Sequence, residues 1–167
     1  MKSYFETLAR YNRWANARLY DAVGQLSAEE IAAPRTGFFP SLLKTLNHLI
    51  VTDRVWLSRL TGAPDPDIKA LDQVVAADFA ELRRQRVALD QRIIETVAGL
   101  APGRIDEVLV YKTMAGAPME TPMTLVLGHM FNHQTHHRGQ AHAMLSSTKV
   151  APPSLDIIVF DREERLA

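Results

Sequence analysis

The sequence predicts an all-α protein, a single domain over residues 1–167 that folds as a four-helix bundle. Apolar residues recur at steps of three and four along four long segments, which is the period of an amphipathic helix. Glycine and proline residues separate these segments from one another. A long connection precedes the last segment. A chain of 167 residues can bury one sizeable core.

The first two long helices are expected over about residues 3–23 and 41–60. Residues 27–30, Ser-Ala-Glu-Glu, have the form of a capping box and predict a short helical turn between them. The apolar stripe of the first helix consists of Phe5, Leu8, Ala9, Ala15, Leu19 and Ala22. That of the second includes Leu42, Leu46, Leu49, Ile50, Trp56 and Leu60.

The third helix is expected over about residues 71–100, with charged side chains on its solvent face. Residues 105–111 are rich in β-branched and aromatic residues, and 114–117 can turn the chain back into 118–120. This part of the long crossover predicts a small hairpin. Thr121-Pro122 resembles an N-cap followed by proline at the first helical position, so the last helix is expected from there to about Ser146.

The tail contains an apolar segment, residues 155–160, which we expect to pack on the bundle or on a partner. The charged residues that follow it, 161–165, are expected to form a solvated end.

The charge balance and the missing cysteines limit the classes of protein to consider. Nineteen Lys and Arg residues match nineteen Asp and Glu residues, and this zero net charge argues against a nucleic-acid-binding surface. Without cysteine there is no disulfide framework, thiolate metal site or cysteine nucleophile. No signal-peptide core and no apolar run of ~20 residues is present, so we expect a cytoplasmic protein that does not enter the membrane.

A cluster of histidines is the strongest functional signal in the sequence. Four of the six histidines lie within residues 129–137, His142 follows closely, and His48 stands alone upstream. Residues four apart on a helix share a face, so His133 and His137 can present two imidazoles to one metal ion. His48 is the obvious third ligand because it is the only histidine outside the cluster.

Helical geometry leaves two pairs of ligands open. His129, His133 and His137 form one slanted stripe, but the outer two are about 12 Å apart along the axis. Only an adjacent pair, 129/133 or 133/137, should therefore bind the metal. His136 could line a pocket, whereas His142 lies about 180° from His133 and is expected at the surface or an interface.

Several motifs resemble those of the DinB family of metal-binding four-helix bundles. They are the string His133-x-x-x-His137-Arg138-Gly139-Gln140, the upstream Asn47-His48-Leu49, the opening Tyr11-Asn12-Arg13-Trp14-Ala15-Asn16, Trp56, and Leu155-Asp156-Ile157-Ile158. The resemblance covers essentially the whole chain.

The resemblance implies an up-up-down-down bundle in which His48, His133 and His137 hold a divalent metal ion, which selects the 133/137 pair. It also implies a homodimer. Relatives in the family include thiol-dependent S-transferases and a glutathione- or mycothiol-dependent isomerase. Residues that could line the pocket or support the ligands are Asp53, His129, His136, Arg138 and Gln140.

These observations favour a metal-dependent enzyme that acts on a small molecule, as a thiol S-transferase or a hydrolase. Three imidazoles suit Zn²⁺ or Ni²⁺ and leave positions open for water or substrate. Any thiol would have to be a low-molecular-weight cofactor, because the chain has no cysteine. The alternative is a non-catalytic metal- or small-ligand-binding module of a stress response. A DNA-associated role is disfavoured by the neutral charge.

Overall fold

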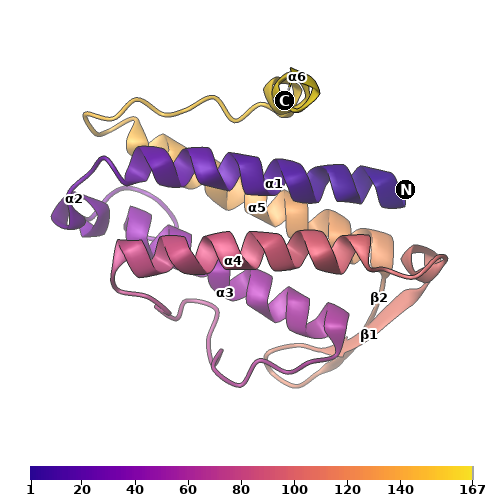
Figure 1. Cartoon of the computed structure of the whole chain (residues 1–167). Helices are drawn as coiled ribbons and strands as arrows, with labels where there is room; N and C mark the ends of the chain where they lie inside the picture. Colours follow the sequence, from indigo (N-terminus) through magenta and orange to yellow (C-terminus); the bar gives the residue numbers. More distant parts are fainter. Residues whose placement is uncertain (167) are drawn as a thin grey trace.

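Four long helices that pack side by side dominate the computed structural model, which describes residues 1–166 (Figure 1). The elements in chain order are α1 Lys2–Val23, α2 Ala28–Ala32, α3 Leu42–Thr61, α4 Phe79–Ala98, the 3-10 turn Arg104–Asp106, β1 Val108–Lys112, β2 Pro118–Pro122, α5 Met123–Leu145 and α6 Ile157–Leu166. The expected helical bundle is confirmed, together with the short capped helix and the hairpin. Among the described residues, no helix is both long and apolar enough to cross a bilayer.

The long helices form a square in which α1 and α3 each pack against both α4 and α5. Helices α1 and α4 are antiparallel, because Lys2 at the start of α1 donates to the carbonyl of Ala98 at the end of α4. Helices α1 and α5 are parallel: the ring of Phe5 stacks on that of Phe131, and Asn12 further along meets Arg138.

The expected up-up-down-down order of directions is wrong. Helices α3 and α4 are parallel, because Asn47 near the start of α3 binds Ala76 just before α4, and Asp53 pairs with Arg86 further along. The order is therefore up, down, down, up. The chain returns along the length of the bundle between α3 and α4, through residues 62–78. The later connection, with the hairpin, joins two helix ends at the same end of the bundle (Figure 1).

The third long helix begins at Phe79 and not near residue 71. Asn47 on α3 accepts hydrogen bonds from the backbone nitrogens of Val75 and Ala76, which holds this stretch in a non-helical path. Asp78 then caps α4 by accepting from the nitrogen of Glu81. The backbone groups that a longer helix would have used are thus bound to a buried side chain of α3.

The last long helix begins at Met123, because Thr121 and Pro122 belong to β2 and do not form the expected cap. The two strands pair antiparallel, with Val108 opposite Pro122. The backbone nitrogen of Met123 donates to the carbonyl of Glu107, 2.9 Å away. The hairpin therefore leads directly into α5.

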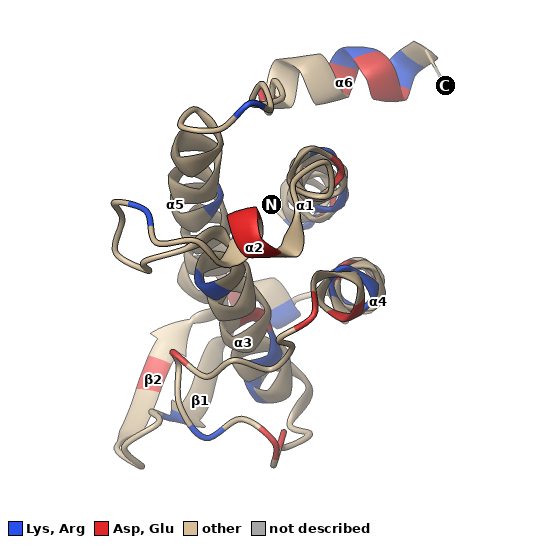
Figure 2. Ribbon diagram, turned by 90° about the vertical axis from the view of Figure 1, so that its left-hand side faces the viewer, with Lys and Arg blue, Asp and Glu red and all other residues tan. Residues whose placement is uncertain are grey.

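The tail forms a helix, α6, that crosses α1 at a steep angle (Figures 1 and 2). Its one buried residue, Phe160, packs against the rings of Tyr11 and Trp14. The expected packing of the apolar tail on the bundle is therefore confirmed. The charged end is more than a solvated segment, because Glu163 and Glu164 pair with Arg18 and Arg10 of α1.

An ionic network lies in the centre of the bundle. Arg86 on α4, with 2 % of its side chain exposed, lies 2.7 Å from Asp53 on α3 and 2.9 Å from Asp90 one turn along α4. The amides of Asn12 and Asn16 on α1 also donate to Asp90. Burial raises the pKa of Asp90, because the charged carboxylate has been removed from water.

Replacing Arg86 with Leu is expected to lower the free energy of unfolding by about 3–5 kcal/mol, because the change leaves Asp53 and Asp90 buried without their shared cation. The same substitution at Arg84 is the matched control. Its exposed pair with Glu81 should contribute far less, because solvent screens the two charges. Chemical denaturation of the three proteins gives the comparison, and equal losses in both variants would contradict a special role for the buried pair.

Replacing Phe160 with Ala is expected to release α6 while the bundle stays folded. The loss of this ring, on the order of 3 kcal/mol, exceeds what the exposed ion pairs of α6 supply. Hydrogen exchange should show loss of amide protection confined to residues 157–166. Ile158→Ala, on the exposed side of the same helix, serves as the control. Unchanged protection of α6 in Phe160→Ala would rule out this ring as its anchor.

Candidate metal centre

Three imidazoles converge between α3 and α5. His48 comes from α3, and His133 and His137 come from adjacent turns of α5. One ring nitrogen of each lies within 4.8 Å of those of the other two. The Nε2 atoms of His48 and His133 are 3.3 Å apart. The three groups can hold a divalent metal ion, and the set includes the 133/137 pair and not 129/133.

The chemistry of these donors suits a metal ion. Burial, together with repulsion from the neighbouring His137 and His48, lowers the pKa of His133 to about 3. Burial also lowers the pKa values of His48 and His137. All three rings are therefore uncharged at neutral pH, which is the form that binds metals.

Hydrogen bonds orient two of the three rings. His48 Nδ1 lies 2.8 Å from the carbonyl oxygen of Leu71, and His137 Nδ1 lies 2.8 Å from Oε1 of Gln140. An oxygen acceptor places the proton on Nδ1, which leaves Nε2 free to bind a metal. Gln140 was among the expected supporting residues. Leu71 was not among them. It contacts His48 through its backbone carbonyl, and it lies in a loop that the periodicity had predicted to be helical.

Two members of the cluster, His48 and His137, line an open cleft of about 750 Å³. Residues of four segments line it: the loop before α3, α3 itself, the loop before α4, and α5. Phe39 packs against His48 with 4.3 Å between ring centroids, and Phe38 beside it is 79 % exposed. Sequence reasoning missed both, although two adjacent phenylalanines in a loop before a helix are an unusual signal. The lining consists of Phe38, Phe39, Pro40, Lys44, His48, Leu71, Asp72, His136, His137 and Gln140.

The other candidate residues take different positions. His136 lines the cleft, with its Nε2 3.1 Å from Gln140 Nε2. His129 lies one turn before His133 on α5, with its ring 5.2 Å from that of Trp56. His142 lies on the outer side, with Nε2 2.9 Å from the carbonyl oxygen of Pro153.

Asp53 and Arg138 lie outside the lining of this cleft and contact other groups. Asp53 is five residues after His48, which turns it about 140° around the helix axis toward Arg86. Arg138 donates to Asn12 and Asn16 of α1 in the bundle core. Neither is hydrogen-bonded to the three histidines.

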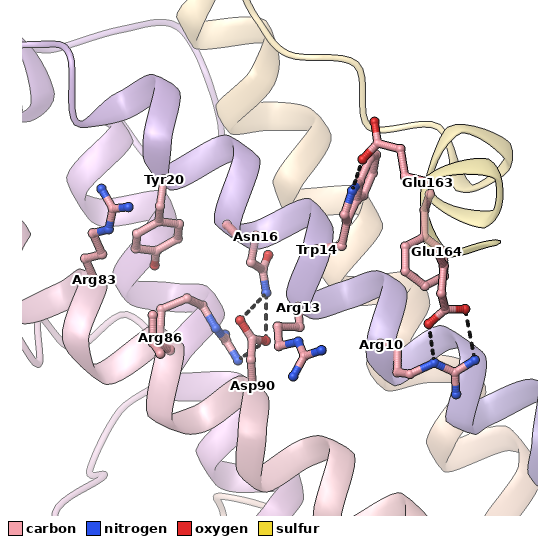
Figure 3. Close-up of a pocket in the computed structure, with 13 residues that line it drawn as sticks. Arg10, Arg13, Trp14, Asn16, Tyr20, Arg83, Arg86, Asp90, Glu163 and Glu164 are labelled. Carbon is pink, nitrogen blue, oxygen red and sulfur yellow. Dashed lines mark hydrogen bonds and ion pairs between the residues drawn. The ribbon is translucent and has the colours of Figure 1, made fainter. Parts of the chain in front are cut away.

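A second cavity, of about 530 Å³, lies between α1, α4 and α6 (Figure 3). Trp14 and Phe160 form part of its wall, and several arginines lie around it. No histidine lines it, so it is separate from the candidate metal centre.

The fold and the histidine cluster define a helical bundle with a candidate three-histidine metal centre. The chain belongs to the DinB family, whose sequence profile matches residues 1–165. This confirms the resemblance that the motifs indicated.

Two proteins of Bacillus subtilis (strain 168) are similar to the chain. Protein DinB is 26% identical over 161 residues, which covers 93% of this chain and 92% of the relative. YizA is 24% identical over 162 residues, covering 95% and 94%. The crystal structure of a DinB-like protein from Bacillus cereus ATCC 10987 shares the fold with a TM-score of 0.65, at 18% identity, covering 87% of this chain and 91% of that one.

Replacing Gln140 with Leu is expected to weaken binding of a divalent metal by about 10–100-fold, because His137 loses the acceptor that fixes its orientation. Calorimetric titration of the metal-free protein measures this change. Gln91→Leu, on the exposed face of α4, is the matched control and should bind as the wild type does. Equal affinities in Gln140→Leu and the wild type would show that His137 needs no support from Gln140.

Proposed function

We propose that the protein is a metal-dependent enzyme that acts on a small molecule in the cleft, as a thiol S-transferase or a hydrolase. The observation that carries the proposal is a set of three convergent imidazoles, two of which, His48 and His137, line an open cleft. A structural metal site is usually closed by four protein ligands, whereas three leave positions free for a reactant. A divalent ion there would supply Lewis-acid chemistry and lower the pKa of a bound water or thiol.

The residues around the cluster support binding of a small molecule. Phe38, Phe39 and Leu71 offer an apolar surface beside the imidazoles, while Lys44 and Asp72 offer one charge of each sign. A cleft of about 750 Å³ is within the range of small-molecule sites. Phe39 covers one side of His48 and His137, which reduces the access of bulk water to those rings.

The proposal extends to the cofactors. Zinc or nickel is the metal that we favour, because first-row divalent ions accept imidazole ligands. A low-molecular-weight thiol is the proposed second reactant for the transferase reaction. It must come from solution because the 167 residues include no cysteine.

The first experiment is to replace His133 with Ala and to measure metal in purified, untagged protein by elemental mass spectrometry. The wild type should carry about one zinc or nickel ion per chain. The variant should lose this ion because it lacks one of the three proposed ligands. His129→Ala is the matched control: it removes an exposed histidine of the same helix that is outside the cluster of three. Full metal content in His133→Ala would overturn the three-histidine site.

Turnover separates an enzyme from a binding module. The metal-loaded protein is screened for transfer of a thiol to electrophilic substrates and for hydrolysis. Activity that disappears in His133→Ala and persists in His129→Ala would support the enzyme. Stoichiometric metal with no turnover in either screen would favour the non-catalytic module.

A further inference from the structure

We infer that Gln134 and Arg138 are positioning residues that hold α5 in the one register and rotation at which His133 and His137 face His48. The inference rests on the proposed function, since it concerns how a metal site would be kept in shape. Each of the two residues directly follows a histidine of the cluster in the sequence. A step of one residue turns about 100° around a helix, so α5 carries two parallel stripes, one toward the cleft and one toward the core.

Gln134 connects α5 to the helix that supplies the third imidazole. Its side chain is 1 % exposed, and Nε2 donates to Oδ2 of Asp53. Asp53 and His48 both lie on α3. The contact between Gln134 and Asp53 therefore fixes how far α5 lies along α3, and with it the placement of His133 relative to His48.

Arg138 connects α5 to the opposite neighbour, α1. Arg138 is 2 % exposed, and its Nη1 lies 2.5 Å from Oδ1 of Asn12 and 3.2 Å from Oδ1 of Asn16. The amide nitrogens of both asparagines donate to Asp90. Figure 3 shows the contact from Asn16 and the pairing of Asp90 with Arg86. Helix α5 is thus bound on two sides to the same central network.

Apolar packing alone would hold this geometry less tightly. Leucine and alanine faces can slide past one another by a fraction of a turn at small cost, whereas a buried hydrogen bond forms only at one spacing and direction. A metal site tolerates displacements of only about 0.2 Å in its ligand distances. Buried polar anchors beside the ligands on α5 supply that constraint before a metal arrives.

The test compares Gln134→Leu and Arg138→Met with the wild type for Co²⁺ and Zn²⁺ affinity of the metal-free proteins. We expect affinity to fall by about 3–30-fold in each variant, the range for substitutions that act through a packed network. The visible spectrum of bound Co²⁺ should also change, because it reports the geometry of the ligands. Arg138→Lys, which keeps a buried donor, should restore part of the affinity.

Ile93→Ala is the control for stability. Ile93 is buried on α4, which does not pack closely against α5, so this variant weakens the bundle without removing an anchor. Denaturation measures the stability of every variant. Loss of affinity and a changed spectrum in Gln134→Leu and Arg138→Met, with a normal spectrum in Ile93→Ala, would support positioning. Wild-type affinity and spectrum in both anchor variants would overturn it, as would equal losses in Ile93→Ala. A wild-type protein that binds neither ion would instead overturn the proposed function on which the inference rests.

Discussion

A guanidinium with almost no exposed surface requires carboxylates beside it, and Arg86 has two, Asp53 on α3 and Asp90 on its own helix. Each of those carboxylates has a further partner. Gln134 of α5 donates to Asp53, and Asn12 and Asn16 of α1 donate to Asp90. All four long helices therefore meet in one polar network. A buried ion pair adds little net stability against an apolar core, but it permits fewer alternative packings. The network consequently specifies which faces of the helices meet.

The candidate metal centre depends on that specification. It draws ligands from two helices, so its geometry is only as well defined as the register between them. The loop of residues 62–78 also helps to orient one ligand, because the carbonyl oxygen of Leu71 contacts His48 Nδ1. This loop is in turn held by Asn47, the residue directly before His48. The site thus combines a rigid pair of helices with a loop whose backbone is bound to the same helix.

Local patterns were sufficient to predict the bundle and to limit the ligands on α5 to the pair 129/133 or 133/137, because helical period and i, i+4 spacing depend on neighbours in the sequence. The family resemblance was needed to select the second pair. Local patterns were insufficient where a distant side chain decides the structure. The side chain of Asn47 accepts a hydrogen bond from the backbone of Ala76, so α4 does not begin near residue 71, where the periodicity predicted its start. Asp53 looked like a support for His48 from its distance in sequence, but its angle around the helix directs it to Arg86. The expected directions of the helices came from the family resemblance alone, because periodicity carries no information about helix direction.

On α5 the histidine ligands lie on one stripe, and the polar residues that bind the neighbouring helices lie on the other. The core stripe and the apolar side chains supply the buried anchors between α5 and its neighbours, and the apolar core cluster contains none of the three histidines. The apolar core and the polar network supply the extensive buried contacts of the fold, in contrast to small zinc domains that are unfolded without their ion. A bound ion would still stabilise the folded state by mass action. The bundle can thus present an already formed, neutral set of ligands on which an ion can be loaded or exchanged.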